Sequence, residues 1–223
     1  MATNTKKVFS YGKPKDPNGH EGEILSLDIS FDGKYLVTAG RDAALRIWSC
    51  AENKYLDALT GHRDEVTSVK FRLNSYELCS VSADRSLKLW DINQRGFMET
   101  FYGHKNKACD VDLLGEKNMV SVGEDKRPIV WKISEETQLI FKDQNFSVDC
   151  VKGINPTTFV TGSQDGVVAL WNNGKTKPVS HIDGAHTGGW ISAIGGIWNS
   201  DFVATGGHDG EVCFFHVDTE KLK

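Results

Sequence analysis

The 223-residue sequence contains no run approaching the roughly 20 apolar residues that cross a bilayer. Its first ten residues, MATNTKKVFS, contain no apolar signal core. These two absences predict a soluble, intracellular protein that does not associate with membranes. The formal net charge is −4, so the molecule as a whole is not attracted to nucleic acid. Any binding of that kind would require a local patch of Lys and Arg.

The sequence also lacks the pairing and spacing of cysteines that mark disulfide frameworks and zinc sites. Its five cysteines, at 50, 79, 109, 150 and 213, are odd in number and form no CxxC pair. Four of them lie in segments that we expect to be strands, and Cys50 directly follows one. This usage favours free thiols in a reducing compartment.

Motifs that carry catalysis or cofactor binding are missing as well. No G-x-S-x-G, P-loop or Rossmann fingerprint occurs, and the glycines between 206 and 210 belong to an expected turn. His181 and His186 have a spacing seen in some zinc sites, but no second pair of ligands accompanies them. We therefore expect no enzyme activity, no cofactor, no metal and no small-molecule substrate.

What the sequence does contain is a fivefold internal repeat. An aromatic residue recurs at intervals of 42, 41, 40 and 44 residues, an aspartate lies six residues before each aromatic, and a hydroxyl lies four residues before each aspartate. A histidine lies 21 to 23 residues before the aspartate in four copies. The aromatics are Trp48, Trp90, Trp131, Trp171 and Phe215; the aspartates are Asp42, Asp84, Asp125, Asp165 and Asp209. The hydroxyls are Thr38, Ser80, Ser121, Thr161 and Thr205; the histidines are His20, His62, His104 and His186.

Each copy has the pattern of four short strands. In the second copy, apolar residues alternate after the histidine, a turn follows at 74–75, and residues 77–81 form a strand that carries the hydroxyl. The aspartate occupies a tight turn into a third strand at 87–90. An outer, more variable fourth strand completes the unit.

The recurring histidine, hydroxyl, aspartate and aromatic positions resemble those of the WD-repeat family, whose propeller blades repeat every 40 to 45 residues with a GH…WD signature. Only Trp90-Asp91 has the literal dipeptide. The resemblance implies an all-β propeller with five visible four-stranded blades, in which histidine, hydroxyl, aspartate and tryptophan form a hydrogen-bonded chain. It assigns such chains to His20, Thr38, Asp42 and Trp48, to His62, Ser80, Asp84 and Trp90, and to His104, Ser121, Asp125 and Trp131. The fourth copy has Lys142-Asp143-Gln144 in place of Gly-His, and the fifth has Phe215, which lacks an indole N–H. We expect weaker or incomplete chains there.

Basic residues gather at the loops that lead into the inner strand and at the aspartate turn, which meet on one face of a propeller. They are Arg41, Arg85, Lys105, Lys107, Lys126 and Arg127. Arg63 is left out because Asp64 and Glu65 adjoin it. A basic sector over the second and third blades could track a phosphate backbone; a solvated surface with scattered charges is the alternative. On the opposite face, Trp198 is either an exposed anchor for a protein or a tucked-in loop residue.

Several blocks are similar to one subfamily, the WD-repeat protein of the U3 small nucleolar ribonucleoprotein. The more particular blocks are Glu-Glu-Thr-Gln-Leu at 135–139, Val-Ala-Leu-Trp at 168–171 and Trp-Ile-Ser at 190–192. The resemblance implies a nucleolar scaffold that binds U3 RNA together with ribonucleoprotein proteins during pre-ribosomal RNA processing. A generic protein-interaction adaptor is the alternative, and a propeller-fold hydrolase is a third, weaker one.

The repeat leaves the closure of the ring open. We divide the chain into residues 1–19, with a possible closing strand at Lys7 to Tyr11, blades at 20–217 and a tail at 218–223. The closing strand could complete a five-bladed ring, or the chain could be a fragment of a seven-bladed propeller. We favour the fragment, because the subfamily normally has seven blades and a charged N-terminal extension. A fragment would expose edge strands and apolar faces, so it should aggregate or need a partner.

Overall fold

The computed structural model describes residues 18–142, 144–218 and 221–222, and these form five four-stranded antiparallel sheets. The first sheet contains β1 (Ile24–Ile29), β2 (Tyr35–Gly40), β3 (Ala44–Ser49) and β4 (Lys54–Thr60). The second contains β5 (Val66–Phe71), β6 (Glu77–Ser82), β7 (Ser86–Asp91) and β8 (Gly96–Tyr102). The third contains β9 (Ala108–Leu114), β10 (Asn118–Gly123), β11 (Ile129–Lys132) and β12 (Thr137–Ile140), with the short 3-10 helix η1 (Ile133–Glu135) before β12. The fourth contains β13 (Val148–Gly153), β14 (Thr158–Ser163), β15 (Val168–Asn172) and β16 (Ser180–Ile182), and the fifth β17 (Ile191–Gly196), β18 (Phe202–Gly207), β19 (Val212–Asp218) and β20 (Lys221–Leu222).

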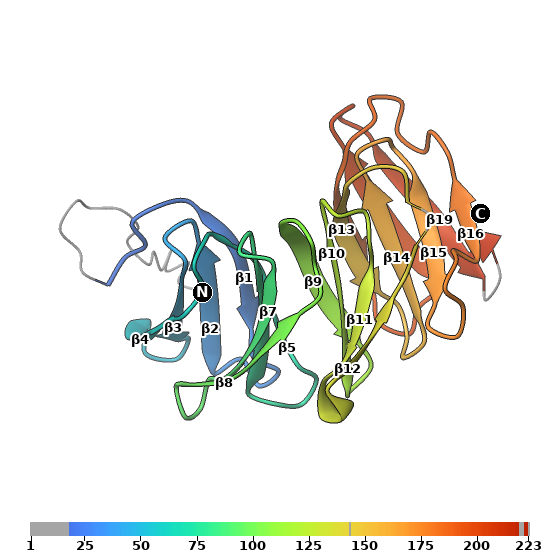
Figure 1. Cartoon of the computed structure of the whole chain (residues 1–223). Coiled ribbons are helices and arrows are strands. Elements are labelled where there is room, and N and C mark those ends of the chain that lie inside the picture. Colours follow the sequence, from blue (N-terminus) through green and yellow to red (C-terminus); the bar gives the residue numbers. More distant parts are fainter. Residues whose placement is uncertain (1–17, 143, 219–220, 223) are drawn as a thin grey trace, which may run out of the picture.

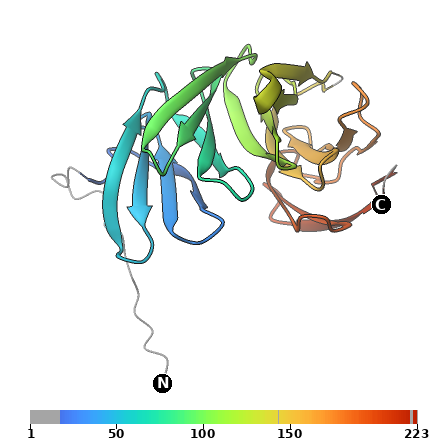
Figure 2. The same cartoon turned by 90° about the horizontal axis from the view of Figure 1, so that it is seen from below.

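The sheets follow one another around an arc, and each is built from four strands consecutive in sequence (Figures 1 and 2). The inner strand of each sheet lies beside the inner strand of the next, in the order β1, β5, β9, β13, β17. This arrangement agrees with the expected all-β fold of radially packed blades. Because every strand pairs with a near neighbour in sequence, the repeat itself fixes the topology.

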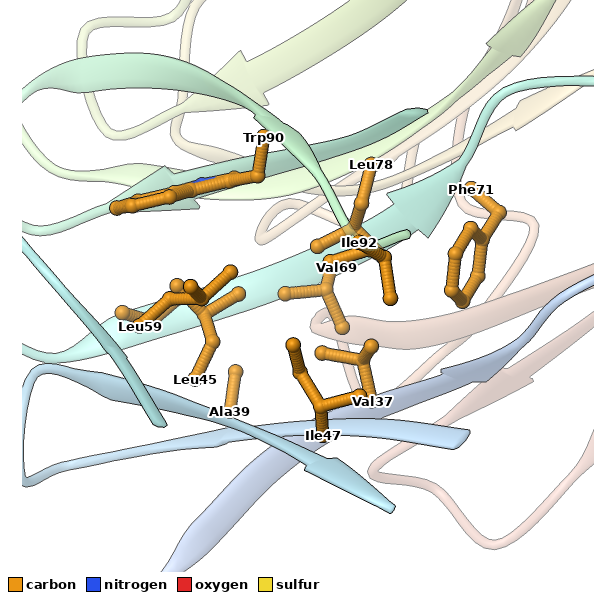
Figure 3. Packing of buried hydrophobic residues seen from close by; sticks show 11 residues of the cluster. Val37, Ala39, Leu45, Ile47, Leu59, Val69, Phe71, Leu78, Trp90 and Ile92 are labelled. Carbon is orange, nitrogen blue, oxygen red and sulfur yellow. The ribbon is translucent and has the colours of Figure 1, made fainter. Parts of the chain in front are cut away.

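Apolar side chains of adjacent sheets interdigitate, as between the first and second sheets in Figure 3. Val37 and Ile47 of the first sheet face Val69, Leu78 and Trp90 of the second, all of them almost completely buried. Full burial of one such side chain stabilises the fold by about 1.5–3 kcal/mol. Each sheet therefore depends on its neighbour to cover its apolar faces.

The two end sheets each have one face that no described residue covers. Leu27 in β1 is 59% exposed, whereas Val69 at the same register of β5 is 2% exposed. Likewise Phe214 in β19 is 63% exposed, whereas Leu170 at the same register of β15 is 0% exposed. The described sheets thus form an open arc and not a closed five-membered ring.

The strand considered at Lys7 to Tyr11 lies outside the described residues. In the described part of the chain, β20 pairs with β19 and takes the place of the fourth strand of the fifth sheet. Leu222 is buried in the cluster between the fourth and fifth sheets. Residues assigned to a tail from the sequence therefore contribute a strand.

A row of polar side chains links the inner strands across the sheet boundaries. The Asp28 carboxylate accepts hydrogen bonds from the Phe71 N–H at 2.8 Å and from Lys70 Nζ at 3.0 Å. The Asp112 carboxylate likewise accepts from the Gly153 N–H at 3.0 Å and from Lys152 Nζ at 2.8 Å. Charges of opposite sign thus alternate at one register of four inner strands, and they satisfy backbone donors that apolar packing alone would leave without partners.

Asp110 lies on β9, two residues before Asp112. Its carboxylate accepts hydrogen bonds from the Ser68 hydroxyl at 2.7 Å and from the Val151 N–H at 2.9 Å. Burial raises the pKa of Asp110 to about 6, and the nearby charge of Asp112 acts in the same direction. The hydrogen bonds from Val151 and Ser68 lower the pKa by less. Asp110 therefore binds its proton more tightly in the folded chain than in the unfolded chain.

We expect the open faces to cause self-association, because large uncovered apolar patches promote it. The double variant Leu27→Lys, Phe214→Lys should lower the apparent mass in sedimentation velocity at micromolar concentrations. Replacement of two exposed polar residues, Glu52 and Glu116, by Lys is the control. Equal association of both variants and the wild type would contradict this prediction.

The raised pKa of Asp110 predicts a stability contribution that is present below pH 4 and is lost as the pH rises through 6. Asp110→Asn removes the titration. The free energy of unfolding of the wild type, measured relative to that of Asp110→Asn by urea denaturation, should fall by about 2–3 kcal/mol between pH 4 and 7. A difference that stays constant over this range would refute the assignment.

Candidate nucleic-acid interface

Each of the first three sheets contains a continuous hydrogen-bonded chain of four side chains. In the second sheet, His62 Nδ1 donates to Asp84 at 2.8 Å, the Ser80 hydroxyl donates to His62 Nε2 at 2.7 Å, and the Trp90 indole N–H donates to Ser80 at 2.8 Å. Because a carboxylate can only accept, Nδ1 of the histidine is the donor in the bond to the aspartate. The third sheet has the same bonds through His104, Ser121, Asp125 and Trp131. The first sheet connects His20, Thr38, Asp42 and Trp48 in the same order, and there Arg46 Nη1 also lies 2.8 Å from His20 Nδ1.

The fourth and fifth sheets contain parts of this chain. In the fourth, the Trp171 indole donates to Thr161 at 2.8 Å, and Asp165 accepts from the Ser163 hydroxyl in place of a histidine. In the fifth, His186 contacts Asp209 at 3.0 Å and Thr205 at 2.7 Å, and the chain ends there because Phe215 has no N–H. The polar connection from turn to sheet is thus complete only in the first three sheets.

In each of the first three sheets, the four hydrogen-bonded side chains fix two loops relative to each other. The backbone N–H of the residue after each histidine also donates to the aspartate: Arg63 to Asp84 at 3.0 Å, and Lys105 to Asp125 at 2.9 Å. These bonds affect the pKa of the aspartate. Burial acts to raise the pKa of Asp84, but the bonds from His62, Ser86 and Arg63 outweigh it, so the pKa is lowered. Cationic side chains next to these groups therefore project from rigid loops.

Four of the six cations selected from the sequence are available for a ligand. Within the described residues, no carboxylate lies within 4.0 Å of the side-chain nitrogens of Arg85, Lys105, Lys126 or Arg127. Arg85, Lys105 and Lys126 are exposed, and Arg127 is half-buried. Lys126 lies 5.9 Å from the ring centroid of Phe146.

The other two selected cations are neutralised by a residue of the second sheet. Arg41 lies 3.4 Å from Glu65 and 3.2 Å from Glu23. Lys107 also bonds to Glu65. Glu65 thus joins the loops of the first, second and third sheets, and it removes Arg41 and Lys107 from the available positive charge.

Arg63, which the sequence argument set aside, belongs with the available cations. Glu65 pairs with Arg41 and Lys107, and among the described residues no carboxylate lies within 4.0 Å of the Arg63 guanidinium. Arg63 is exposed beside Arg85. Adjacency in sequence suggested a local charge offset, whereas Glu65 pairs with cations of two other sheets. We call Arg63, Arg85, Lys105, Lys126 and Arg127 the basic sector.

Two residues of the basic sector adopt a backbone conformation that favours glycine. Arg85 and Lys126 directly follow the aspartate of the tight turn and have φ angles of 72° and 64°. The equivalent residues of the fourth and fifth sheets are Gly166 and Gly210, both with φ 78°. A side chain at positive φ costs about 1 kcal/mol, so the second and third sheets carry cations where glycine would be more stable.

Other candidate sites from the sequence have plain structural roles. Among the described residues, no group of three His, Cys, Asp or Glu side chains could hold a metal ion. All five cysteines are free thiols, and burial raises the pKa of Cys79 to about 12. Trp198 is half-buried beside Pro156, so it is not a freely exposed anchor. No helix in the described part of the chain is long and apolar enough to cross a membrane.

Comparison with known proteins agrees with this geometry. The family model described as "WD domain, G-beta repeat" matches residues 13–49 and 53–91. A solved structure titled "Structure of U3-55K" superposes with a TM-score of 0.89 at 36% identity, over 93% of this chain and 67% of that one. The chain belongs to the WD-repeat family. Its five sheets are WD-repeat blades, and we number them in sequence order.

Relatives in the same family have names that refer to the U3 ribonucleoprotein. A rice protein, "U3 snoRNP-associated protein-like YAOH", is 35% identical over 241 residues, which cover 96% of this chain and 47% of the relative. The mouse "U3 small nucleolar RNA-interacting protein 2" is 37% identical over 211 residues, 90% of this chain and 44% of the relative. The chain spans about half the length of the curated relatives it matches.

The lowered pKa of Asp84 predicts that the second blade loses stability in acid. The charged carboxylate stabilises the fold above the unfolded pKa of about 3.9, and this contribution is lost as the pH falls towards the folded value. Asp84→Asn should lower the free energy of unfolding by about 1–3 kcal/mol at pH 7, and its difference from the wild type should shrink between pH 5 and 3.

Urea denaturation at several pH values measures both effects. Asp165→Asn in the fourth blade is the matched control, because its carboxylate has no histidine partner among the described residues. An equal cost at both positions would show that the histidine bond contributes little.

Proposed function

We propose that this chain is a non-catalytic WD-repeat scaffold that binds a U3-like small nucleolar RNA together with ribonucleoprotein proteins. Its place would be the nucleolus, in the assembly that processes pre-ribosomal RNA. The relatives named above support this role by their identity over nearly the whole chain. The histidines and aspartates of the repeat act in the hydrogen-bonded chains, so they support a structural role and not catalysis.

The observation that carries the proposal is the basic sector. These five cations lie on the rigid loops of two neighbouring blades in a protein of net charge −4. Unpaired cations at a fixed spacing can contact successive phosphates, and the release of counterions from the RNA then drives binding. The turn positions of Arg85 and Lys126 add support, because both carry a long cationic side chain where glycine would be more stable.

Charge reversal within the basic sector tests the proposal. The triple variant Lys105→Glu, Lys126→Glu, Arg127→Glu should bind a structured RNA hairpin at least about tenfold more weakly at 0.1 M salt. Its affinity should also depend less steeply on salt concentration, because each lost phosphate contact lowers the slope by about 0.9. Fluorescence anisotropy over a salt series measures both quantities.

The control reverses three cations on the opposite loops of the blades: Arg95 and Lys175, which are exposed, and Lys117, which is half-buried. This variant has the same net charge as the first, so equal losses would point to a nonspecific charge effect. A second variant, Lys126→Gly, relieves the positive φ and should keep or raise stability while it weakens binding. Unchanged RNA binding in the triple variant would overturn the assignment of the basic sector.

RNA crosslinked to the protein in cells tests the biological part of the proposal. Sequencing of that RNA should return a nucleolar profile dominated by a U3-like species. Recovery of proteins without RNA would instead favour a protein-interaction adaptor.

A further inference from the structure

A cavity of about 260 Å³ opens on the second blade next to the basic sector. It is formed where the loop before β5, the turn between β6 and β7 and the end of β8 come together. Arg63, Arg85, Lys88 and Tyr102 line it, together with Gly61, Asp84, Ser86 and His104. We call this cavity the second-blade pocket.

The second-blade pocket has an excess of positive charge. Lys88 Nζ donates to Thr100 at 2.6 Å and lies 5.1 Å from the ring centroid of Phe97, and neither group carries a negative charge. Asp84 is the only carboxylate in the lining, and both its oxygens already accept hydrogen bonds. Three cations therefore converge on one fully engaged carboxylate, which is the electrostatic signature of an anion site.

Comparison of the repeats shows how this excess arises. Arg46 of the first blade has the register of Lys88, since Arg46 pairs with Thr38 and Lys88 with Ser80. Arg46 bonds to Asp42 at 2.6 Å. In the second blade the Ser86 hydroxyl donates to the Asp84 carboxylate at 2.6 Å. The first blade has Ala44 at the position of Ser86 and so lacks this bond. Lys88 itself donates to Thr100, at the register where the first blade has Ala58, and among the described residues no carboxylate lies within 4.0 Å of its Nζ.

The other blades do not repeat the arrangement. The residues at the register of Lys88 in the third, fourth and fifth blades are Ile129, Ala169 and Cys213, none of which is cationic. Tyr102 also differs from its counterpart in the first blade, which has Thr60 at that register. The second-blade pocket is therefore not a by-product of the repeat.

Tyr102 gives the second-blade pocket an aromatic surface. Its side chain is 73% exposed, although burial of an aromatic ring normally stabilises a fold. An exposed ring beside arginines is the combination that binds an unpaired nucleotide, whose base stacks on the ring while its phosphate contacts the cations. A phosphorylated side chain would satisfy the cations but would leave the ring without a role.

We propose that the second-blade pocket holds one unpaired nucleotide of the bound RNA, with its base stacked on Tyr102 and its phosphate against Arg63, Arg85 and Lys88. This inference rests on the proposed RNA-binding function. It assigns the basic sector two parts: the third blade contacts the phosphate backbone, and the second blade captures a base. It also predicts that the RNA has an unpaired nucleotide next to a structured region.

The test uses the full chain and the RNA hairpin described above, with and without a single-stranded tail of uridines. Tyr102→Ala should weaken binding of the tailed RNA about tenfold, since stacking of one base is worth about 1–3 kcal/mol, and Tyr102→Phe should restore it. Removal of the tail should weaken wild-type binding by a similar factor but should leave Tyr102→Ala unaffected. Lys88→Ala and Arg85→Ala should each lower the salt dependence for the tailed RNA by about 0.7.

Trp190→Ala is the matched control, because Trp190 is an exposed aromatic residue in the fifth blade, outside the second-blade pocket. A 4-thiouridine in the tail should crosslink to the peptide that contains Tyr102. Thermal melting of each variant shows whether the fold is retained, and Tyr102→Phe covers the case in which alanine disturbs it.

The outcomes separate the two proposals. If the wild type binds no RNA, both fail. If the triple charge reversal abolishes binding while Tyr102→Ala behaves like Trp190→Ala, the second-blade pocket is overturned and the proposed function stands. A phosphoserine peptide could instead compete with the tailed RNA and bind the wild type and Tyr102→Ala with equal affinity. That result would overturn the proposed nucleotide ligand in favour of a phosphopeptide.

Discussion

The bond between a buried histidine and the aspartate of a tight turn is the constraint on which the rest of this structure depends. It connects the loop that enters a blade with the turn between the second and third strands, and the hydroxyl and the tryptophan extend it into the sheet. In the second blade every donor and acceptor of the four side chains has a partner, so these bonds rigidify the loops at little electrostatic cost. Surface cations next to the histidine and the aspartate are therefore attached to rigid loops.

A second constraint acts between blades. Apolar faces are covered only by the neighbouring blade, and the inner strands are linked by carboxylates that accept from the backbone of the next strand. These two kinds of contact make stability a property of neighbouring pairs, as in other repeat proteins. The uncovered faces around Leu27 and Phe214 mark where such pairs are missing in the described part of the chain.

The available positive charge on the loop face depends on which cations form ion pairs with carboxylates of the same or a neighbouring blade. Glu65 pairs with cations from two other blades, whereas Asp84 accepts from Ser86 and forms no ion pair with Lys88, which donates to Thr100. The result is a positive region confined to the second and third blades of an acidic protein. The same two blades have complete hydrogen-bonded chains, so positive charge and rigidity coincide there.

Local pattern was enough to predict the five blades, their four strands and the columns of histidine, hydroxyl, aspartate and tryptophan, because each bond in these units joins residues within one repeat. The local pattern did not show which cations form ion pairs and which do not. Glu65 meets Arg41 and Lys107 only after three repeats have packed, and adjacency in sequence gives no sign of these two pairs. The strand at 221–222 and the uncovered end faces likewise depend on packing between sheets. Short-range periodicity thus determined the fold, and long-range contacts decided where positive charge remains available to a ligand.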